Sequence, residues 1–124
     1  MRSFYSKKVM EHFLHPKHMG NMDNPDGVGS TENLKCGDVM KIYIRVVDNK
    51  ISDIKFETLG CGHALAASDM ICDLALGKTL GQAKQIKFSD VIAELGDIPK
   101  PKMHCSSLAE HALKEAIKDY EEKS

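Results

Sequence analysis

The chain lacks several features that would assign it to a common class of protein. Its 17 Lys and Arg residues balance 18 Asp and Glu residues, so the formal net charge is −1 and no excess of positive charge favours DNA, RNA or an anionic membrane. No stretch approaches the roughly 20 apolar residues that span a bilayer, and Met1 to Lys8 lack the apolar run of a signal peptide. Repeats and low-complexity tracts are also absent. We therefore expect a cytoplasmic protein that binds neither nucleic acid nor membrane.

Length and cysteine usage indicate the number of domains and the redox state of the thiols. A chain of 124 residues with 42% hydrophobic content can bury one core, so we expect a single domain over residues 1–124. Four cysteines could form two disulfides in an exported protein, but the missing export signal favours reduced thiols. No cysteine pair has the close spacing of a zinc finger or zinc ribbon.

Three cysteines nevertheless stand beside other metal-binding residue types. Cys36 is followed by Asp38, Cys61 lies between two glycines, and Cys105 directly follows His104. Thiolates bind zinc, copper(I) and iron in iron–sulfur clusters, and a carboxylate or imidazole in the remaining position leaves such a site exchangeable. Since these residues are far apart in sequence, the fold must bring them together.

A predicted hairpin brings two of the thiols close. Met40 to Val46 and Ile54 to Thr58 alternate apolar and polar residues, with a turn near Asn49, so an antiparallel hairpin is the simplest arrangement. Cys36 and Cys61 would then meet at its open end. If the first strand extends back to Asp38, the side chains of Asp38 and Cys36 share a face roughly 7 Å apart.

The remaining pattern predicts helices and loops around the hairpin. Helices are expected at Tyr5 to Phe13, Ala64 to Leu76 and Ser89 to Leu95. A fourth helix is expected after a capping box at Ser107 to Glu110. An irregular loop is expected at Lys17 to Asn33, and an extended linker at Ile98 to Lys102. Cys61 and Cys105 each lie just before a helix, where the helix dipole favours the thiolate. Lys102 would lower the pKa of the Cys105 thiol further.

Other cysteine and histidine residues have simpler interpretations. Cys72 lies too far along the second helix to share a centre with Cys61, and we interpret it as a buried small hydrophobic residue. His63 is a second imidazole near Cys61 and a weaker candidate ligand. His12, His15 and His18 are interpreted as surface residues, because Pro16 prevents a common helical face.

Several ordered motifs resemble one family along essentially the whole chain. They are Cys36-Gly37-Asp38-Val39-Met40, Gly60-Cys61-Gly62-His63-Ala64, Gly77-Lys78-Thr79-Leu80 and Lys102-Met103-His104-Cys105-Ser106-Ser107-Leu108-Ala109-Glu110, with Tyr5 to Phe13 and Asp26 to Gly29 in support. Together they resemble the IscU/NifU family of iron–sulfur cluster assembly scaffolds, and the NifU-type branch in particular.

The resemblance implies a fold, a site and a function. The fold would be α+β, with a small, mainly antiparallel three-stranded sheet, helices packed on one side and a long C-terminal helix. Cys36, Cys61 and Cys105 match the cluster-ligating cysteines, Asp38 the aspartate and His104 the histidine of the family. The protein would be a scaffold and not an enzyme: a cysteine desulfurase passes sulfur to Cys105, ferrous iron joins it, and a labile [2Fe–2S] cluster is built and transferred to acceptor proteins.

Three features depart from the family pattern. Ile98 to Lys102 differs from the Leu-Pro-Pro-Val-Lys motif that an Hsp70-type chaperone recognises, so the resemblance does not extend to that partner. His63 stands where the family often has a small residue. The sequence also ends at Ser124, before the additional domains of long NifU proteins would begin, so we expect a stand-alone scaffold.

Two other functions and several details stay open. A zinc-bound sulfur acceptor of the SufU type would use the same thiols, but that branch has an insertion before its last cysteine and lacks the preceding histidine. An enzyme with Cys105 as nucleophile and His104 as base is disfavoured because adjacent residues usually diverge in direction. The sequence leaves open the metal state as purified (zinc, [2Fe–2S] or none), the choice between Asp38 and His104 as fourth ligand, and whether the protein is a monomer or a cluster-bridged oligomer.

Overall fold

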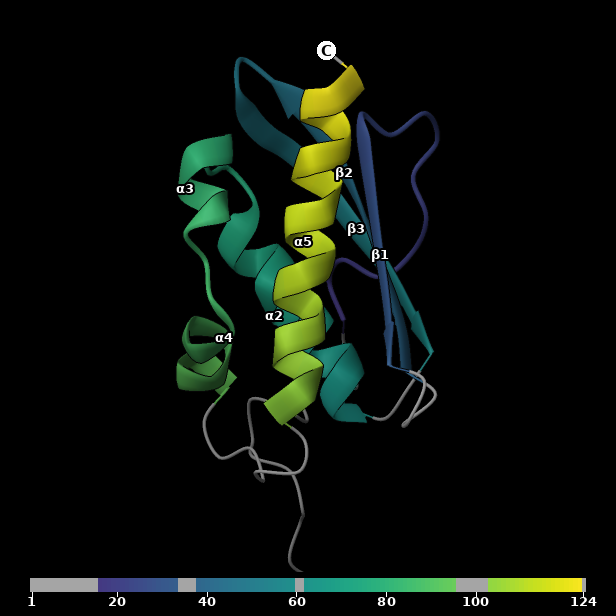
Figure 1. The fold of residues 1–124 in the computed structure, drawn as a ribbon, viewed down its shortest axis with the longest axis vertical. Coiled ribbons are helices and arrows are strands. Elements are labelled where there is room, and N and C mark those ends of the chain that lie inside the picture. The colour runs from purple at the N-terminus through teal and green to yellow at the C-terminus, as the bar shows by residue number, and fades with distance from the viewer. Residues whose placement is uncertain (1–15, 34–37, 60–61, 96–102, 124) are drawn as a thin grey trace, which may run out of the picture.

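A three-stranded antiparallel sheet forms the centre of the fold. The computed structural model describes residues 16–33, 38–59, 62–95 and 103–123 (Figure 1). Strands β1 (Gly27–Asn33), β2 (Asp38–Val47) and β3 (Lys50–Leu59) lie in the order β1-β2-β3, so β2 is central. The predicted hairpin is confirmed as β2 and β3. Its turn residues Asp48 and Asn49 both have positive φ, the conformation whose twist matches that of paired strands.

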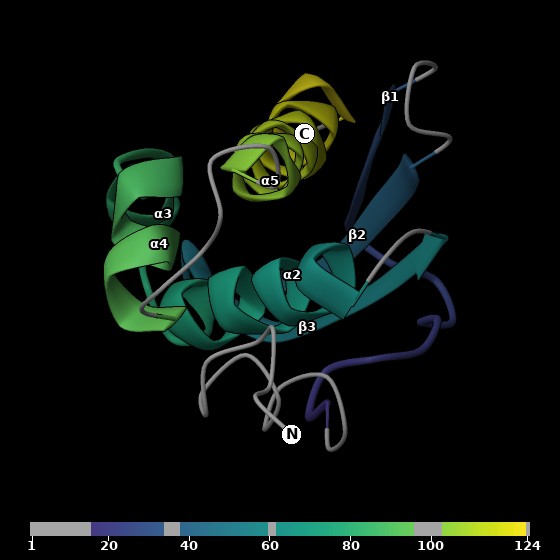
Figure 2. The same cartoon turned by 90° about the horizontal axis from the view of Figure 1, so that it is seen from below.

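Four helices complete the described structure. They are α2 (Gly62–Ala75), α3 (Leu80–Lys84), α4 (Phe88–Leu95) and α5 (Met103–Lys123). Helix α5 packs on β1 and β2 while α2 packs on β3, and the two helices also contact each other, so both cover the same face of the sheet (Figures 1 and 2). The α+β class, the three-stranded sheet and the long C-terminal helix are confirmed. The helix expected at Tyr5 to Phe13 and the linker at Ile98 to Lys102 lie outside the described residues.

Alternation along the strands places the core between the sheet and these helices. Met40, Ile42 and Ile44 of β2 are fully buried, as are Ile54 and Phe56 of β3. Every second side chain of a strand faces the same side, so these residues form one apolar face. The facing helices contribute Ala66, Ala67 and Ile71 from α2 and Ala109, Ala112, Leu113, Ala116 and Ile117 from α5.

The prediction of an irregular loop from Lys17 to Asn33 is wrong for its second half, which is strand β1. Gly27 and Gly29 weaken the strand signal, yet they allow close packing. A Cβ atom at Gly29 would overlap the carbonyl oxygen of Ala112 and the nitrogen of Ala116, and one at Gly27 would overlap the Ala116 carbonyl oxygen. Strand β1 therefore exists because helix α5 lies directly on its backbone.

The interpretation of His18 as a surface residue is also wrong. Its side chain is buried, and its Nε2 atom lies 2.8 Å from Oδ1 of Asp73 on α2. The backbone nitrogens of Lys17 and His18 both donate to Oδ1 of buried Asp69, at 2.8 and 2.9 Å. The main chain on either side of Met19 then pairs with Phe56 at the otherwise free edge of β3. Two carboxylates of α2 thus hold the segment that precedes β1.

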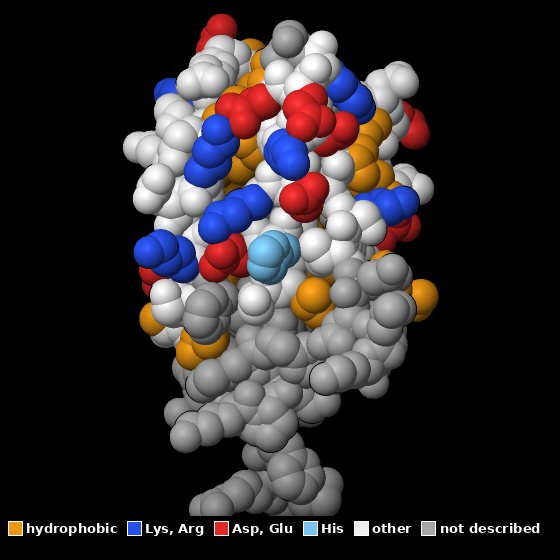
Figure 3. Space-filling view, viewed as in Figure 1, with side chains coloured by type: hydrophobic (Ala, Val, Ile, Leu, Met, Phe, Trp, Pro, Cys, Tyr) orange, Lys and Arg blue, Asp and Glu red, His pale blue; other side chains and the backbone are white. Residues whose placement is uncertain are grey.

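The described residues hold no membrane-spanning helix, and charges of both signs are mixed on one face of the molecule. In the part of the chain that the structure covers, no helix is long and apolar enough to cross a bilayer. On the face shown in Figure 3, Lys and Arg side chains are mixed with Asp and Glu side chains. That face therefore carries no area of a single charge sign.

Candidate functional site

The ends of five chain segments meet at one end of the molecule. In Figure 1 the last residues of β1 and β3 and the first residues of β2, α2 and α5 all lie toward the bottom. The register agrees, because Asn33 pairs with Asp38 and Val39 pairs with Leu59. We call this the ligand end, because each expected ligand lies in sequence at or beside one of these element ends.

The expected ligands differ in how far the structure describes them. Cys36, Cys61 and Lys102 lie outside the described residues, in the connections from β1 to β2, from β3 to α2 and from α4 to α5. The backbone of the other four is described: Asp38 is the first residue of β2, His63 lies in the first turn of α2, and His104 and Cys105 lie in the first turn of α5. The structure does not describe the side chains of these four residues.

Helix α5 begins earlier than the sequence predicts. The prediction that a capping box at Ser107 to Glu110 starts this helix is wrong, because the helix already starts at Met103 and Ser107 lies inside it. Cys105 is therefore a first-turn residue and does not precede the helix.

Free backbone N–H groups at the starts of α2 and α5 favour negative charge near Cys61 and Cys105. Neither helix has an acidic residue in its first turn. Within these two first turns, therefore, no acidic side chain competes for the N–H groups. A helix N-terminus of this kind favours a thiolate over a thiol, and a thiolate is the better metal ligand and nucleophile.

Cys72 has the opposite environment, and its interpretation as a buried small hydrophobic residue is confirmed. Its side chain is fully buried within α2. Burial raises the pKa of the Cys72 thiol well above its ordinary value, and the nearby carboxylates of Asp69 and Asp73 raise it further. Cys72 is therefore a protonated core residue at neutral pH.

Two threonine hydroxyls connect the elements at the ligand end. Oγ1 of Thr58, near the end of β3, donates to the carbonyl oxygen of Val39 in β2 at 2.7 Å. Oγ1 of Thr31, near the end of β1, donates to the carbonyl oxygen of Leu108 in α5 at 3.1 Å. No local sequence pattern distinguishes either threonine, because the partner of each hydroxyl is distant in sequence.

The outer face of the hairpin has a hollow at the same end. Its volume is about 310 Å³, and it is lined by Val39, Lys41, Glu57, Thr58 and Leu59. Leu59 is 72% exposed and stands two residues before Cys61 in sequence. The described surface beside the ligand end is therefore partly apolar, with one positive and one negative side chain.

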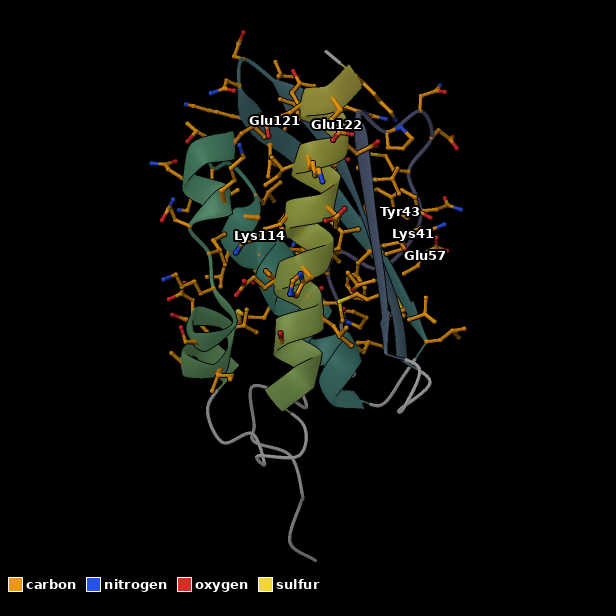
Figure 4. The ribbon with its side chains drawn as sticks, in the orientation of Figure 1. Lys41, Tyr43, Glu57, Lys114, Glu121 and Glu122 are labelled. Carbon is orange, nitrogen blue, oxygen red and sulfur yellow. The ribbon has the colours of Figure 1, made fainter. Side chains whose placement is uncertain are left out.

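A hydrogen bond also raises the pKa of a tyrosine on this face. Figure 4 shows Lys41, Tyr43 and Glu57 close together on the sheet. The Tyr43 hydroxyl donates to Oε1 of Glu57, and this bond, with burial and the Glu57 charge, raises the pKa of Tyr43 to about 12. The phenol therefore remains protonated at neutral pH.

The described side chains do not themselves form a metal site. No group of three His, Cys, Asp or Glu side chains among them could hold a metal ion. The expected ligands lie outside that set of side chains, so their coordination remains a prediction.

Comparisons with known proteins agree with the family resemblance. The family described as "NifU-like N terminal domain" matches residues 4–124. The chain is 51% identical over 116 residues to the "Iron-sulfur cluster assembly scaffold protein IscU 1" of Archaeoglobus fulgidus. This match covers 94% of this chain and 76% of that protein. The chain is 45% identical over 123 residues to the "Iron-sulfur cluster assembly scaffold protein IscU" of Escherichia coli K12. This match covers 96% of this chain and 95% of that protein.

A solved structure supports the fold independently. The N-terminal part of a nitrogen-fixing NifU-like protein from Brucella abortus matches with a TM-score of 0.74 and covers 96% of this chain and 95% of that chain. At 20% sequence identity, the match shows the fold alone.

Proposed function

Because this chain belongs to the family of NifU-like N-terminal domains, we propose that it is a scaffold on which an iron–sulfur cluster is assembled and from which the cluster is passed on. The observation that carries this proposal is the likeness to a protein named as a scaffold, at 51% identity over 94% of the chain. The meeting of element ends beside all three candidate cysteines supports it. A single scaffold domain over residues 1–124 is part of the proposal.

Cys36, Cys61 and Cys105 would supply the thiolate ligands. Thiolates are the usual ligands of iron in iron–sulfur clusters. Asp38 and His104 are the candidates for the remaining position, and either could occupy it in a different state of the site. An oxygen or imidazole ligand binds iron less covalently than a fourth thiolate, so the cluster would be labile. A cluster donor needs that property.

Sulfur would enter at Cys105. Its thiolate attacks the outer sulfur of a persulfide on a cysteine desulfurase, the desulfurase cysteine leaves as a thiolate, and Cys105 becomes the persulfide. The first-turn position of Cys105 in α5 supports this role, because the helix N-terminus lowers the pKa of such a thiol. Lys102, three residues earlier, would stabilise the same thiolate.

The cargo of this scaffold would be a [2Fe–2S] cluster. Zinc suits the same thiolates and would bind in the cluster-free form. The protein would act without turnover chemistry of its own: the desulfurase supplies sulfur, and acceptor proteins receive the cluster. It would work in the cytoplasm as a monomer or a cluster-bridged oligomer.

Anaerobic reconstitution tests the proposal. The full chain is incubated with ferrous iron, cysteine, a cysteine desulfurase and a thiol reductant, which reduces the transferred sulfur to sulfide. We expect visible sulfide-to-iron charge-transfer bands, with equimolar iron and acid-labile sulfide in the chain. Cys36→Ser, Cys61→Ser and Cys105→Ser should each abolish the bands, while Cys72→Ala should retain them.

Zinc analysis in the same experiment separates the SufU-type alternative. A colourless protein that keeps one zinc per chain yet accelerates the desulfurase would be a sulfur acceptor, and the scaffold proposal would then be wrong. Retention of the bands in all three serine variants would also contradict the proposal, because the cluster would then lie elsewhere.

A further inference from the structure

The expected ligands come from separate elements, so their spacing depends on how these elements are held together. Asp38 begins β2, Cys61 lies between β3 and α2, and Cys105 lies in the first turn of α5. In a zinc knuckle a short turn fixes the spacing between ligands. Here, only contacts between elements can fix it.

Thr31 holds strand β1 to helix α5 at the ligand end. Gly27, Gly29 and Thr31 are alternate residues of β1 and therefore share a face. At both glycines the helix backbone lies too close for a side chain, whereas at Thr31 the hydroxyl donates to the carbonyl oxygen of Leu108 at 3.1 Å. Thr31 stands five residues before Cys36, and Leu108 three residues after Cys105.

Thr58 holds the two strands of the hairpin together at the same end. Its hydroxyl donates to the carbonyl oxygen of Val39 at 2.7 Å, next to the pairing of Val39 with Leu59. Val39 directly follows Asp38, and Leu59 stands two residues before Cys61. The Thr31 and Thr58 bonds are both partly buried, so water replaces them poorly when they are lost.

We propose that Thr31 and Thr58 are positioning residues for the bound metal and cluster. The Thr31 hydroxyl fixes the end of β1 against the start of α5, which carries Cys105. The Thr58 hydroxyl fixes the start of β2, which carries Asp38, against the end of β3, which precedes Cys61 in sequence. Metal sites tolerate displacements of only about half an ångström without loss of fit. The two hydroxyls therefore set how tightly the site holds its cargo, a role that rests on the proposed function.

Cobalt binding to the full chain tests this role. Co²⁺ is titrated anaerobically into the wild type, Thr31→Val and Thr58→Val, and the d–d and thiolate-to-cobalt absorption bands are recorded. Valine has nearly the shape of threonine but no hydroxyl. We expect each valine variant to bind Co²⁺ on the order of tenfold more weakly, as for other residues that orient metal ligands, with shifted d–d bands. Thr31→Ser and Thr58→Ser should restore both the affinity and the bands.

Two controls separate positioning from loss of stability. Ser52→Ala removes a hydrogen bond of the same kind, from Oγ of Ser52 to the carbonyl oxygen of Arg45 at 3.1 Å, near the opposite end of the hairpin. Ile51→Val weakens the fully buried core near that end. Urea unfolding ranks the stability of all variants, and we expect both controls to keep the Co²⁺ affinity within about twofold and the bands unchanged.

The possible outcomes distinguish this proposal from the proposed function. If the wild type binds Co²⁺ through its thiols and the valine variants match it in affinity and bands, the positioning role is wrong and the scaffold function stands. The positioning role is also wrong if Ile51→Val loses as much affinity as the threonine variants. If the wild type binds no Co²⁺ through Cys36, Cys61 and Cys105, both proposals fail.

Discussion

Asp38 occupies a position at which one carboxylate could control cluster release. It is the first residue of β2 and pairs with Asn33 at the ligand end. If Asp38 supplies the exchangeable oxygen ligand, Asp38→Ala should transfer its cluster to an acceptor protein on the order of tenfold more slowly. Transfer is followed by the rise of the acceptor's own absorption or activity after mixing.

Asp53→Ala is the matched control, since Asp53 lies on the same hairpin toward the turn and pairs with Arg45. It should transfer its cluster at the wild-type rate. Equal or faster transfer by Asp38→Ala would remove Asp38 from this role.

Tyr43 gives the fold a dependence on alkaline pH. Its pKa is raised from the ordinary 10.0 to about 12, chiefly by the hydrogen bond to Glu57. Because the folded-state pKa lies above the unfolded one, the stabilising contribution is complete below about pH 10 and is lost as the pH rises through about 12. We expect Glu57→Gln to move the pKa of Tyr43 down toward 10.0, measured by tyrosinate absorbance against pH.

Tyr43→Phe is the reference for this titration, because the chain has three tyrosines. The difference between the wild-type and Tyr43→Phe curves isolates the Tyr43 phenol. Between pH 10 and 12 the wild type should lose more stability than Tyr43→Phe. A Tyr43 midpoint that Glu57→Gln does not change would show that Glu57 is not the cause.

At the scale of elements, the contact between β1 and α5 determines the position of the helix that carries Cys105. Gly29→Ala places a methyl group against the backbone of Ala112 and Ala116, so strand and helix must separate. We expect a loss of about 3 kcal/mol in the free energy of unfolding, at the upper end of typical overpacking costs. Urea denaturation with two spectroscopic probes measures this loss.

The same substitution at Gly81 is the control. Gly81 lies in α3, and a Cβ atom there would meet no other heavy atom within 4 Å. Alanine favours a helix over glycine by about 0.5–1 kcal/mol, so Gly81→Ala should stabilise the protein slightly. If both variants changed stability by the same amount, close packing would not be the reason for Gly29.

Elements with strong local patterns could be predicted from the sequence. The alternation in β2 and β3 with its Asp48–Asn49 turn gave the hairpin, and the apolar run up to Gly77 gave α2 with nearly its observed ends. Helix α4 starts at Phe88, one residue before the predicted Ser89. In each case the local sequence and the tertiary packing favour the same structure.

Elements that depend on distant partners could not be predicted in this way. Strand β1 depends on α5, and the burial of His18 depends on Asp69 and Asp73, more than 50 residues away. Helix α3 was missed because its five residues are too few to show a period, although Thr79 and Gln82 form its capping box. The ligand set came from residue types and family motifs, and its coordination remains a prediction.

At the scale of the whole molecule, a bound metal should act as a cross-link. The expected ligands lie at the starts of β2, α2 and α5 or in the connections that precede them in sequence, and these three elements together carry most of the described core. A metal that binds only the folded chain stabilises it by about 2.7 kcal/mol when its free concentration is 100 times the dissociation constant. We expect Zn²⁺ to raise the melting temperature, and a chelator to reverse the increase.

Cysteine variants determine whether this stabilisation comes from the ligand end. Cys36→Ser, Cys61→Ser and Cys105→Ser should each lose most of the Zn²⁺-induced increase, because each removes the ligand that one connection or helix start contributes. Cys72→Ala should lower the melting temperature without metal, since Cys72 is fully buried in α2, but keep the full increase with Zn²⁺. If Cys72→Ala lost the increase while Cys36→Ser kept it, zinc would bind within the core of α2 and the three element ends would not form one metal site.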